Sequence, residues 1–338
     1  MTALQITQPH QLNLIQLPAP QPAADEVLLR ILYVGFCGSD LNTYRGRNAL
    51  ALSPVIPGHE ISAVVEAVGS NVPASLHRGQ QVTVNPYSAC GSCPSCRRRR
   101  FNACQFNETL GVQRHGAMRE QLVVPWQKVI PAEGLAPQDV ALIEPMSVGF
   151  HAVDRGQVTD ADTVLVIGCG MIGVGAIVRA SLRGATVIAV DLDDAKLALA
   201  RQLGAAATIN SGTDDLHARL QELTDGNGPD VVVEAVGAAA TYATAVAEVA
   251  FAGRLVCIGY APADVALPTR LFVQKELDIR GSRNALPEDF RAVVHYLRRG
   301  LCPTASLISA IVAPDGAAEA LKDWDAAPSK VFRILVRF

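Results

Sequence analysis

The chain has 338 residues, of which 49% are apolar and 18% charged, and its formal net charge is −3. This composition is typical of a globular protein with large buried cores, and the length favours two domains. A slightly acidic chain has no general attraction to nucleic acid or anionic membranes. No apolar run reaches the roughly 18 residues of a membrane span. The N-terminal segment does not resemble a signal peptide, so we expect a cytoplasmic protein.

Residues 1–152 contain short apolar and β-branched runs separated by prolines and glycines: "EVLLRILYVG", "ISAVVEAVG", "QQVTVNPY" and "EQLVVPW". They predict a first domain of short strands and tight turns. In residues 153–282 the strands are continuous apolar runs such as "DTVLVIG", "ATVIAVD", "DVVVEAVG" and "RLVCIG", and alanine-rich helical segments lie between them. This alternation predicts an α/β domain with a doubly wound parallel sheet.

Residues 283–338 change pattern again. "LPEDFRAVVHYLRRG" begins with Pro287 and acidic residues and ends with two arginines and Gly300, which predicts a helix. The terminal "KVFRILVRF" alternates like a strand. We expect this segment to return to the first domain, so that the α/β domain is an insertion.

A dinucleotide site is predicted after the first strand of the central domain. "VLVIGCGMIGVG" places Gly168, Gly170 and Gly173 in GxGxxG order between a strand and a helix, and Asp191 ends the next strand. Such glycines let the backbone approach a pyrophosphate at the helix N-terminus. A carboxylate at Asp191 accepts hydrogen bonds from ribose hydroxyls and repels a 2′-phosphate, which favours NAD over NADP.

Four cysteines are clustered in "ACGSCPSCRRRRFNAC". Their C-x2-C-x2-C-x7-C spacing suits a closed tetrahedral zinc site with a structural role, in a lobe spanning residues 86–108. Clustered cysteines in a reducing cytosol bind metal more often than they form disulfides, and an iron–sulfur cluster is the competing metal interpretation. The run Arg97–Arg100 could instead be a nucleic-acid patch, but a solvated surface is the simpler interpretation. The clustered residues are Cys90, Cys93, Cys96 and Cys104.

A second group of metal-ligating residues is dispersed along the chain. "GFCGSD" supplies Cys37 with Ser39 and Asp40, "PGHE" supplies His59 and Glu60, and "LIEPMSVG" supplies Glu144. One thiolate, one imidazole and one or two carboxylates could bind zinc and leave a coordination position open.

These motifs occur together, and in this order, in a known family. The chain resembles the zinc-dependent medium-chain alcohol dehydrogenases over essentially its whole length. "EPMSVG" is similar to the sorbitol dehydrogenase branch, and "GSRNALPEDF" resembles bacterial L-galactonate, L-gulonate or L-idonate 5-dehydrogenases. The resemblance implies a GroES-like catalytic domain beside the Rossmann-type domain, and an NAD-dependent oxidoreductase that is a homo-oligomer, either a tetramer or a dimer.

The resemblance also implies residue roles. Cys37 and His59 would bind a catalytic zinc, with Glu60 and Glu144 as alternative or simultaneous ligands. Asp40 would accept a hydrogen bond from His59, and Ser39 would relay a proton. Asn42 stands where many relatives have a histidine, so the resemblance does not say which group passes the proton to solvent. We assign to the cofactor site Gly168, Gly170, Met171, Ile172, Gly173, Asp191, Lys196, Val236, Ile258, Gly259 and Tyr260.

The expected reaction transfers hydride from a secondary alcohol of a sugar acid or polyol to NAD and leaves a ketone. Arg283 and Asn284 are the predicted substrate residues, because a guanidinium can hold a carboxylate through two parallel hydrogen bonds. Arg45 and Arg47 are weaker candidates. L-Threonine 3-dehydrogenase activity is the alternative within the same class. A zinc-binding nucleic-acid protein and a non-catalytic cofactor sensor are alternatives of other classes.

Overall fold

The computed structural model describes residues 1–338. The chain divides into two compact units, of which the first comprises residues 1–144 and 286–338 and the second residues 145–285. The sequence predicted segments 1–152, 153–282 and 283–338, so the observed boundaries lie eight residues earlier at the first junction and three residues later at the second. None of the helices is both long and apolar enough to span a membrane.

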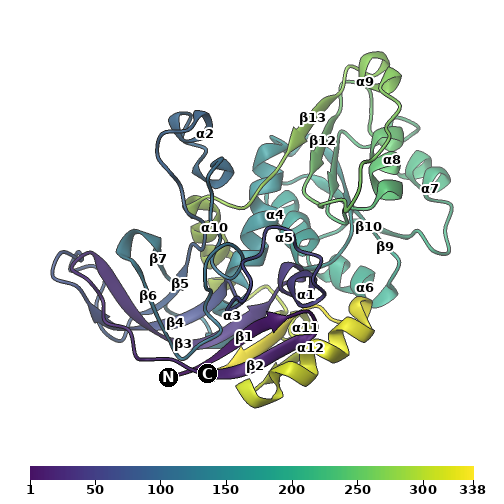
Figure 1. Ribbon diagram of the computed structural model, residues 1–338. Helices are drawn as coiled ribbons and strands as arrows, with labels where there is room; N and C mark the ends of the chain where they lie inside the picture. Colours follow the sequence, from purple (N-terminus) through teal and green to yellow (C-terminus); the bar gives the residue numbers. More distant parts are fainter. The chain divides into compact units, whose positions relative to one another are not determined.

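The first unit is built on a seven-stranded sheet. The strands follow the order β14-β15-β3-β4-β5-β7, and β6 also pairs with β3. The C-terminal strand β15 lies antiparallel to β3, so the last residues of the chain join the strand that leads to Cys37 (Figure 1). The strands of this unit are β1 (Thr2–Gln8), β2 (Gln11–Gln16), β3 (Glu26–Phe36), β4 (Glu60–Val68), β5 (Gln81–Val84), β6 (Gln121–Pro125), β7 (Val129–Pro131), β14 (Ala310–Val312) and β15 (Ile334–Arg337).

The helices of the first unit are mostly short. The longest is α10, which begins at Pro287, as the proline and acidic residues predict, and is followed by Gly300 at φ +68°. The helix α12 packs on β2. The α-helices are α1 (Gly38–Tyr44), α2 (Pro94–Arg97), α3 (Pro137–Val140), α10 (Pro287–Arg298), α11 (Thr304–Leu307) and α12 (Ala317–Ala326); the 3-10 helices are η1 (Phe101–Ala103), η2 (Trp126–Lys128), η3 (Pro314–Gly316) and η4 (Pro328–Lys330).

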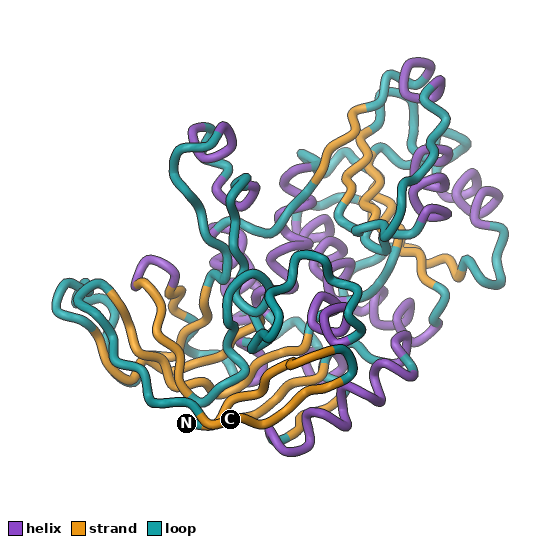
Figure 2. The backbone as a smooth tube through the Cα atoms, in the orientation of Figure 1, coloured by secondary structure: helices purple, strands orange, loops and turns teal.

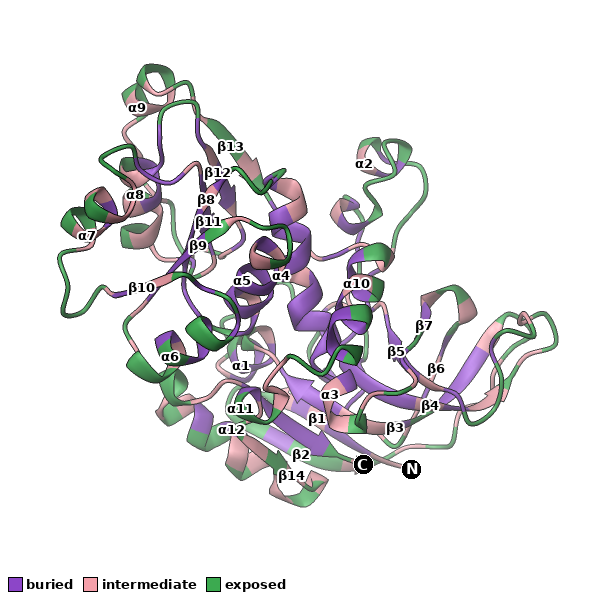
Figure 3. Cartoon of the chain, turned by 180° about the vertical axis from the view of Figure 1, so that it is seen from behind, coloured by how far each residue is buried: buried purple, intermediate pink, exposed green.

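The second unit contains a six-stranded parallel sheet of order β10-β9-β8-β11-β12-β13. Its inner strands are buried, because helices cover a parallel sheet on both faces (Figure 3). The strands are β8 (Thr163–Ile167), β9 (Thr186–Asp191), β10 (Ala207–Asn210), β11 (Val231–Glu234), β12 (Arg254–Cys257) and β13 (Asp278–Gly281). The helices are α5 (Met171–Leu182), α6 (Asp194–Gln202), α7 (Leu216–Leu223), α8 (Ala239–Glu248) and α9 (Arg270–Gln274), and α4 (Ile143–Arg155) leads into this unit.

The strand order of the second unit reverses at β8. The chain leaves β8 for β9 on one side and later returns to β11 on the other. In open parallel sheets, ligands bind beyond the carboxyl ends of the strands at such a switch point. The glycine motif follows β8 directly, so the fold places it where a dinucleotide would bind.

Candidate active site and metal centres

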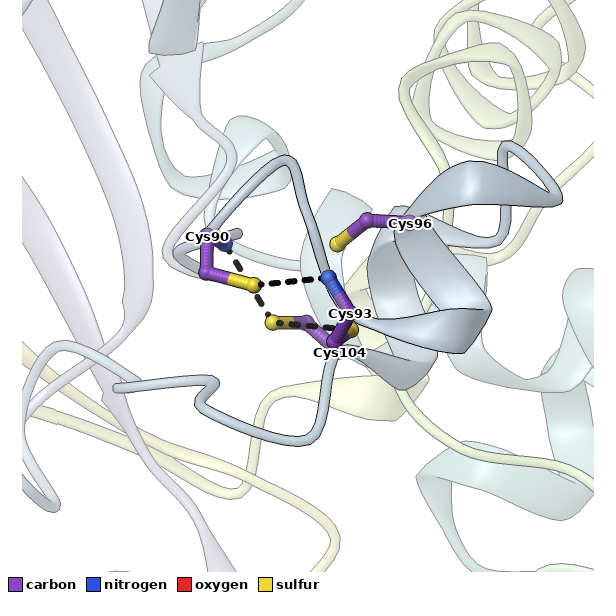
Figure 4. Close-up of side chains that lie close together, drawn as sticks. All are labelled: Cys90, Cys93, Cys96 and Cys104. Atoms are coloured by element: carbon purple, nitrogen blue, oxygen red, sulfur yellow. Dashed lines mark hydrogen bonds between the residues drawn. The ribbon is translucent and has the colours of Figure 1, made fainter.

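The four clustered cysteines lie on a loop of the first unit that carries only the short helices α2 and η1 (Figure 2). Their sulfur atoms all lie within 4.8 Å of one another, and none is in a disulfide. Figure 4 shows the side chains converging from the loop, from α2 and from the returning segment. Four sulfur atoms this close match a closed tetrahedral zinc shell, which leaves no position for a substrate.

Backbone N–H groups donate to several sulfurs of this loop. The N–H of Cys93 donates to the Cys90 sulfur at 3.3 Å, and the N–H of Phe106 donates to the Cys104 sulfur at 3.3 Å. Donors from Cys96 and Gln105 lower the pKa of Cys93 to about 5. Since zinc binds thiolates, these residues fit the metal. The side chains of Arg97–Arg100 are exposed, and Arg97 donates to the carbonyl of Ser92.

Three of the four dispersed candidate ligands, Cys37, His59 and Glu60, come together in the first unit. Cys37 directly follows β3 and precedes α1, while His59 and Glu60 lie at the start of β4, the neighbour of β3. One ligand atom from each of these three residues lies within 4.8 Å of the others. His59 and Glu60 are buried, as is Glu144 in the first turn of α4. Pairing between β3 and β4 therefore assembles residues that are more than 20 positions apart in sequence.

Several buried polar atoms of this cluster have no hydrogen-bond partner. They are His59 Nδ1 and Ser39 Oγ, together with both carboxylate oxygens of Glu60. Buried polar groups in folded proteins are normally paired, so unsatisfied atoms around one point indicate a missing ligand. A sulfur, an imidazole and a carboxylate are a donor set that zinc accepts. The residues therefore fit a catalytic zinc.

The charges around His59 also favour a cation. Burial alone would lower the pKa of His59, but the nearby Cys37 sulfur, with Asp40 and Glu144, raises it well above its ordinary value. The acidic groups around His59 therefore favour a positive charge at this point of the first unit.

Two partners of the candidate ligands have no local signal in the sequence. Arg333, 5% exposed and just before β15, forms an ion pair with Glu60 through its Nε at 3.0 Å from Oε2 and donates from Nη1 to the Phe36 carbonyl. The Nε–H is not aligned for a hydrogen bond, so this contact is an ion pair only. The hydroxyl of buried Tyr87 donates to Glu144 Oε1. Each candidate carboxylate is therefore held by a different side chain.

The predicted hydrogen bond from His59 to Asp40 is wrong. The two Asp40 oxygens accept instead from the backbone N–H groups of Cys37, at 2.8 Å, and Gly58, at 3.3 Å, and His59 Nδ1 has no partner. Asp40 is the third residue of α1, where an acidic side chain commonly caps the helix N-terminus. It thus positions the backbone on both sides of the cluster. The capping-box position could have indicated this role.

The glycine loop of the second unit has the conformation that its sequence requires. Gly168 adopts φ +96°, and a Cβ at Gly173 would lie 1.8 Å from the Gly168 carbonyl oxygen. Asp191 accepts from the Cys169 N–H at 2.7 Å and from the Leu192 N–H at 2.8 Å, so it joins this loop to the end of β9.

The remaining residues assigned to the cofactor lie in two places. Some are in the first turns of helices that follow β8 and β9, and others are at the carboxyl ends of β11 and β12. Val236 and Tyr260 are exposed, with 51% and 78% of their surface accessible, as expected of side chains that could contact a ligand. The helix residues are Met171, Ile172 and Lys196; the strand-end residues are Val236, Ile258, Gly259 and Tyr260.

The candidate substrate residues lie on two different units. Arg283 and Asn284 follow β13 in the second unit and are half-buried, and Asn284 adopts φ +54°. Arg45 belongs to the first unit, where its guanidinium pairs with Asp325. The ion pair gives Arg45 a structural role, whereas Arg47 is exposed.

Comparison with known proteins supports the resemblance. Residues 23–134 match the alcohol dehydrogenase GroES-like domain, and residues 172–299 match the zinc-binding dehydrogenase family. L-Galactonate-5-dehydrogenase of Escherichia coli K12 is 34% identical over 300 residues, which cover 89% of this chain and 88% of that protein. Sorbitol dehydrogenase of Bacillus subtilis is 33% identical over 314 residues, which cover 88% of this chain and 86% of that protein.

Solved structures agree with this relationship. RspB of E. coli CFT073, crystallised with NADH, superposes with a TM-score of 0.91 at 30% identity and covers 100% of this chain and 99% of its own. Galactitol-1-phosphate dehydrogenase of E. coli gives a TM-score of 0.92 at 28% identity, with full coverage of both chains. The chain is therefore an oxidoreductase that uses zinc and a nicotinamide cofactor, and it belongs to the zinc-type medium-chain alcohol dehydrogenase family.

Proposed function

We propose that the protein oxidises a secondary hydroxyl of a sugar acid or polyol to a ketone. The hydride passes to NAD, which becomes NADH, and the hydroxyl proton is released. The buried cluster of Cys37, His59 and Glu60, with its unpartnered polar atoms, is the observation that carries the proposal. The names of related proteins, which include L-galactonate, sorbitol and erythritol/L-threitol dehydrogenases, support this substrate class.

Zinc held by Cys37 and His59, with Glu60 or Glu144, would supply a Lewis acid that favours loss of the proton from a substrate hydroxyl. Ser39 Oγ is suited to relay that proton, by accepting it while passing its own hydroxyl proton on toward water, since Oγ is buried without a partner two residues after Cys37. Asn42 is exposed and does not titrate, so the proton leaves through water or through a group other than residue 42.

The cofactor would lie across the carboxyl ends of β8 and β9. The glycine loop would leave space for the pyrophosphate, and Asp191, whose carboxylate accepts from the Cys169 N–H, would also accept hydrogen bonds from the adenosine ribose. The negative charge of Asp191 disfavours the 2′-phosphate of NADP, which supports NAD as the cofactor.

Arg283 and Asn284 are proposed to recognise the substrate. A guanidinium binds a carboxylate through two parallel hydrogen bonds, so Arg283 would distinguish a sugar acid from a neutral polyol. The backbone of Asn284 is in the left-handed region, a conformation often found at functional positions.

The experiment is a spectrophotometric screen of NAD reduction over stereoisomeric aldonates and alditols, with L-galactonate, sorbitol, galactitol and L-threonine included. We expect the highest kcat/KM for a sugar acid or polyol. A higher value for L-threonine would establish the alternative activity instead, since threonine dehydrogenases share the zinc ligands and the glycine loop.

We also propose that the protein acts in the cytosol as a homo-oligomer. No disulfide joins any of the eight cysteines, which supports a reducing compartment. Light scattering of the purified protein measures the number of subunits, and a monomer would contradict this proposal.

A further inference from the structure

Glu234 is a fully buried carboxylate of the second unit that the proposed chemistry does not use. It is the last residue of β11, and 0% of its surface is exposed. Its Oε1 accepts from the backbone N–H groups of Val236, at 3.0 Å, and Gly237, at 2.8 Å. The hydroxyl of Thr241 also donates to this oxygen, at 2.8 Å. A buried carboxylate is unfavourable without hydrogen bonds, so these three donors explain why the fold tolerates one here.

Two loops meet around this carboxylate. The first, residues 235–238, follows β11, and the second, residues 258–260, follows the neighbouring parallel strand β12. They approach so closely that a Cβ at Gly259 would lie 2.1 Å from the Gly237 nitrogen and 2.6 Å from Glu234 Oε2. The side chain of Glu234 therefore bonds to the first loop and packs against the second.

The helix α8 is connected to both loops. Thr241 of this helix contacts the first loop through Glu234. The hydroxyl of the next residue, Tyr242, donates to the carbonyl of Gly259 in the second loop. Burial, with the nearby Cys257 and Glu234, raises the pKa of Tyr242, so its hydroxyl stays protonated and can donate. The carboxylate and the phenol thus join two separate strand ends to one helix.

These loops lie on the side of the sheet away from Asp191. The strands follow the order β9-β8-β11-β12, with Asp191 at the end of β9 and the glycine loop after β8. A dinucleotide with its adenosine at β9 and its pyrophosphate at β8 would extend its nicotinamide half over the ends of β11 and β12. Val236 and Tyr260 of the two loops are 51% and 78% exposed, so their side chains are accessible to a ligand there.

We propose that Glu234 is a positioning residue for the nicotinamide half of the cofactor, because its carboxylate holds residues 235–238 and 258–260 in the conformation that the cofactor binds. The inference rests on the proposed placement of the cofactor across the strand ends, and it assigns no contact between Glu234 and the cofactor itself. A loop that folding has already ordered binds a ligand more tightly than one that the ligand must order. The property required of residue 234 is an acceptor oxygen at the Oε1 position, and its negative charge is secondary.

The test uses two variants of the full-length protein that separate reach from charge. Glu234→Asp keeps the charge but is one methylene shorter, which withdraws its oxygens from the N–H groups of Val236 and Gly237. Glu234→Gln loses the charge but keeps an oxygen that can accept from both. The Kd for NADH is measured by fluorescence titration. We expect Glu234→Asp to weaken NADH binding by about tenfold or more, and Glu234→Gln to stay within about threefold of the native chain.

Binding of AMP distinguishes positioning from a general effect on folding. AMP carries only the adenosine side of the cofactor, so its Kd, measured by calorimetry, should be the same in both variants as in the native chain. Glu248→Asp is the matched control, because it shortens a carboxylate at the C-terminal end of α8 that pairs with His217. It should change the Kd of neither ligand.

A second variant removes a donor instead of the acceptor. Thr241→Val deletes the hydroxyl that donates to Glu234 Oε1 and keeps the shape of the side chain. It should weaken NADH binding by about threefold to tenfold without weakening AMP binding. It also replaces Glu234→Asp in the test if that variant does not fold.

Native NADH affinity in Glu234→Asp, or in Thr241→Val where it takes that place, would overturn the inference. An equal loss of NADH and AMP affinity would overturn it as well, and so would a loss in Glu234→Gln as large as that in Glu234→Asp. NADH binding needs neither zinc nor an alcohol, so the result does not depend on the substrate class proposed above. If AMP does not compete with NADH on the native chain, the proposed placement of the cofactor fails, whichever result the variants give.

Discussion

Arg333 lies 3.0 Å from Glu60, so a residue five positions before the C-terminal Phe338 holds a carboxylate of the candidate catalytic cluster. Arg333 and Glu60 are 5% and 0% exposed, which makes this a buried ion pair. The pair is possible because β15 joins β3 in the register that places Ile334 opposite Phe36, next to Cys37. The return of the chain to the first unit thus completes the cluster.

Replacing Arg333 should destabilise the protein strongly. Arg333→Met leaves the Glu60 carboxylate buried without its cation, and loss of one partner of a buried pair costs about 3–5 kcal/mol. We expect the free energy of unfolding, measured with urea, to fall by about this amount. Arg337→Met, at an exposed position of β15, is the matched control and should change it by less than about 0.5 kcal/mol.

The double variant Glu60→Gln/Arg333→Met checks that the pair is the cause. It removes both charges, so its loss of stability should be smaller than the sum of the two single losses. Simple additivity would show that the guanidinium and the carboxylate act independently.

Replacing Asp191 should relax the choice of cofactor. Asp191→Asn removes the negative charge and keeps one acceptor oxygen, for the N–H of either Cys169 or Leu192, which donate to different oxygens of the carboxylate. The ratio of kcat/KM for NADP to that for NAD should rise by about tenfold or more, which corresponds to about 1.4 kcal/mol. Asp160→Asn, at an exposed position of the same unit, should leave the ratio unchanged. An unchanged ratio in Asp191→Asn would show that this carboxylate does not exclude the phosphate.

Removing the guanidinium of Arg283 should separate charged from neutral substrates. We expect Arg283→Ala to raise KM for sugar acids by about 10- to 100-fold, because a hydrogen bond to a charged group contributes about 1.5–3 kcal/mol. KM for neutral polyols should change far less. Arg47→Ala, which removes an exposed arginine, should affect neither class. Equal losses for both classes in Arg283→Ala would refute carboxylate recognition.

The four-cysteine site should bind its metal independently of the catalytic cluster. Cys93→Ser removes a ligand that backbone donors stabilise as a thiolate, so bound zinc should decrease by one ion per chain. The loop of residues 89–107 should then be cleaved faster in limited proteolysis, because zinc closes it. Cleavage at the native rate would show that zinc does not hold this loop together.

The parts of the fold that depend on local patterns could be predicted from the sequence. Apolar runs and glycine spacing identified the strands around Gly168, and the cysteine spacing identified the metal loop. Arg333 and Tyr87 could not be found this way, because each contacts a residue far away in the sequence and no short pattern records such a contact. Asp40 was misassigned for a different reason: its carboxylate accepts from nearby backbone N–H groups, which the expected pairing with His59 overlooked.

The central claim is that Cys37, His59 and an adjacent carboxylate bind zinc for catalysis. Elemental analysis of the fully loaded chain tests it most directly, with Cys37→Ser as the comparison. We expect two zinc ions in the native chain and one in Cys37→Ser, with oxidation of the alcohol lost in the variant. A native chain that binds a single zinc, still bound after Cys37→Ser, would contradict the account.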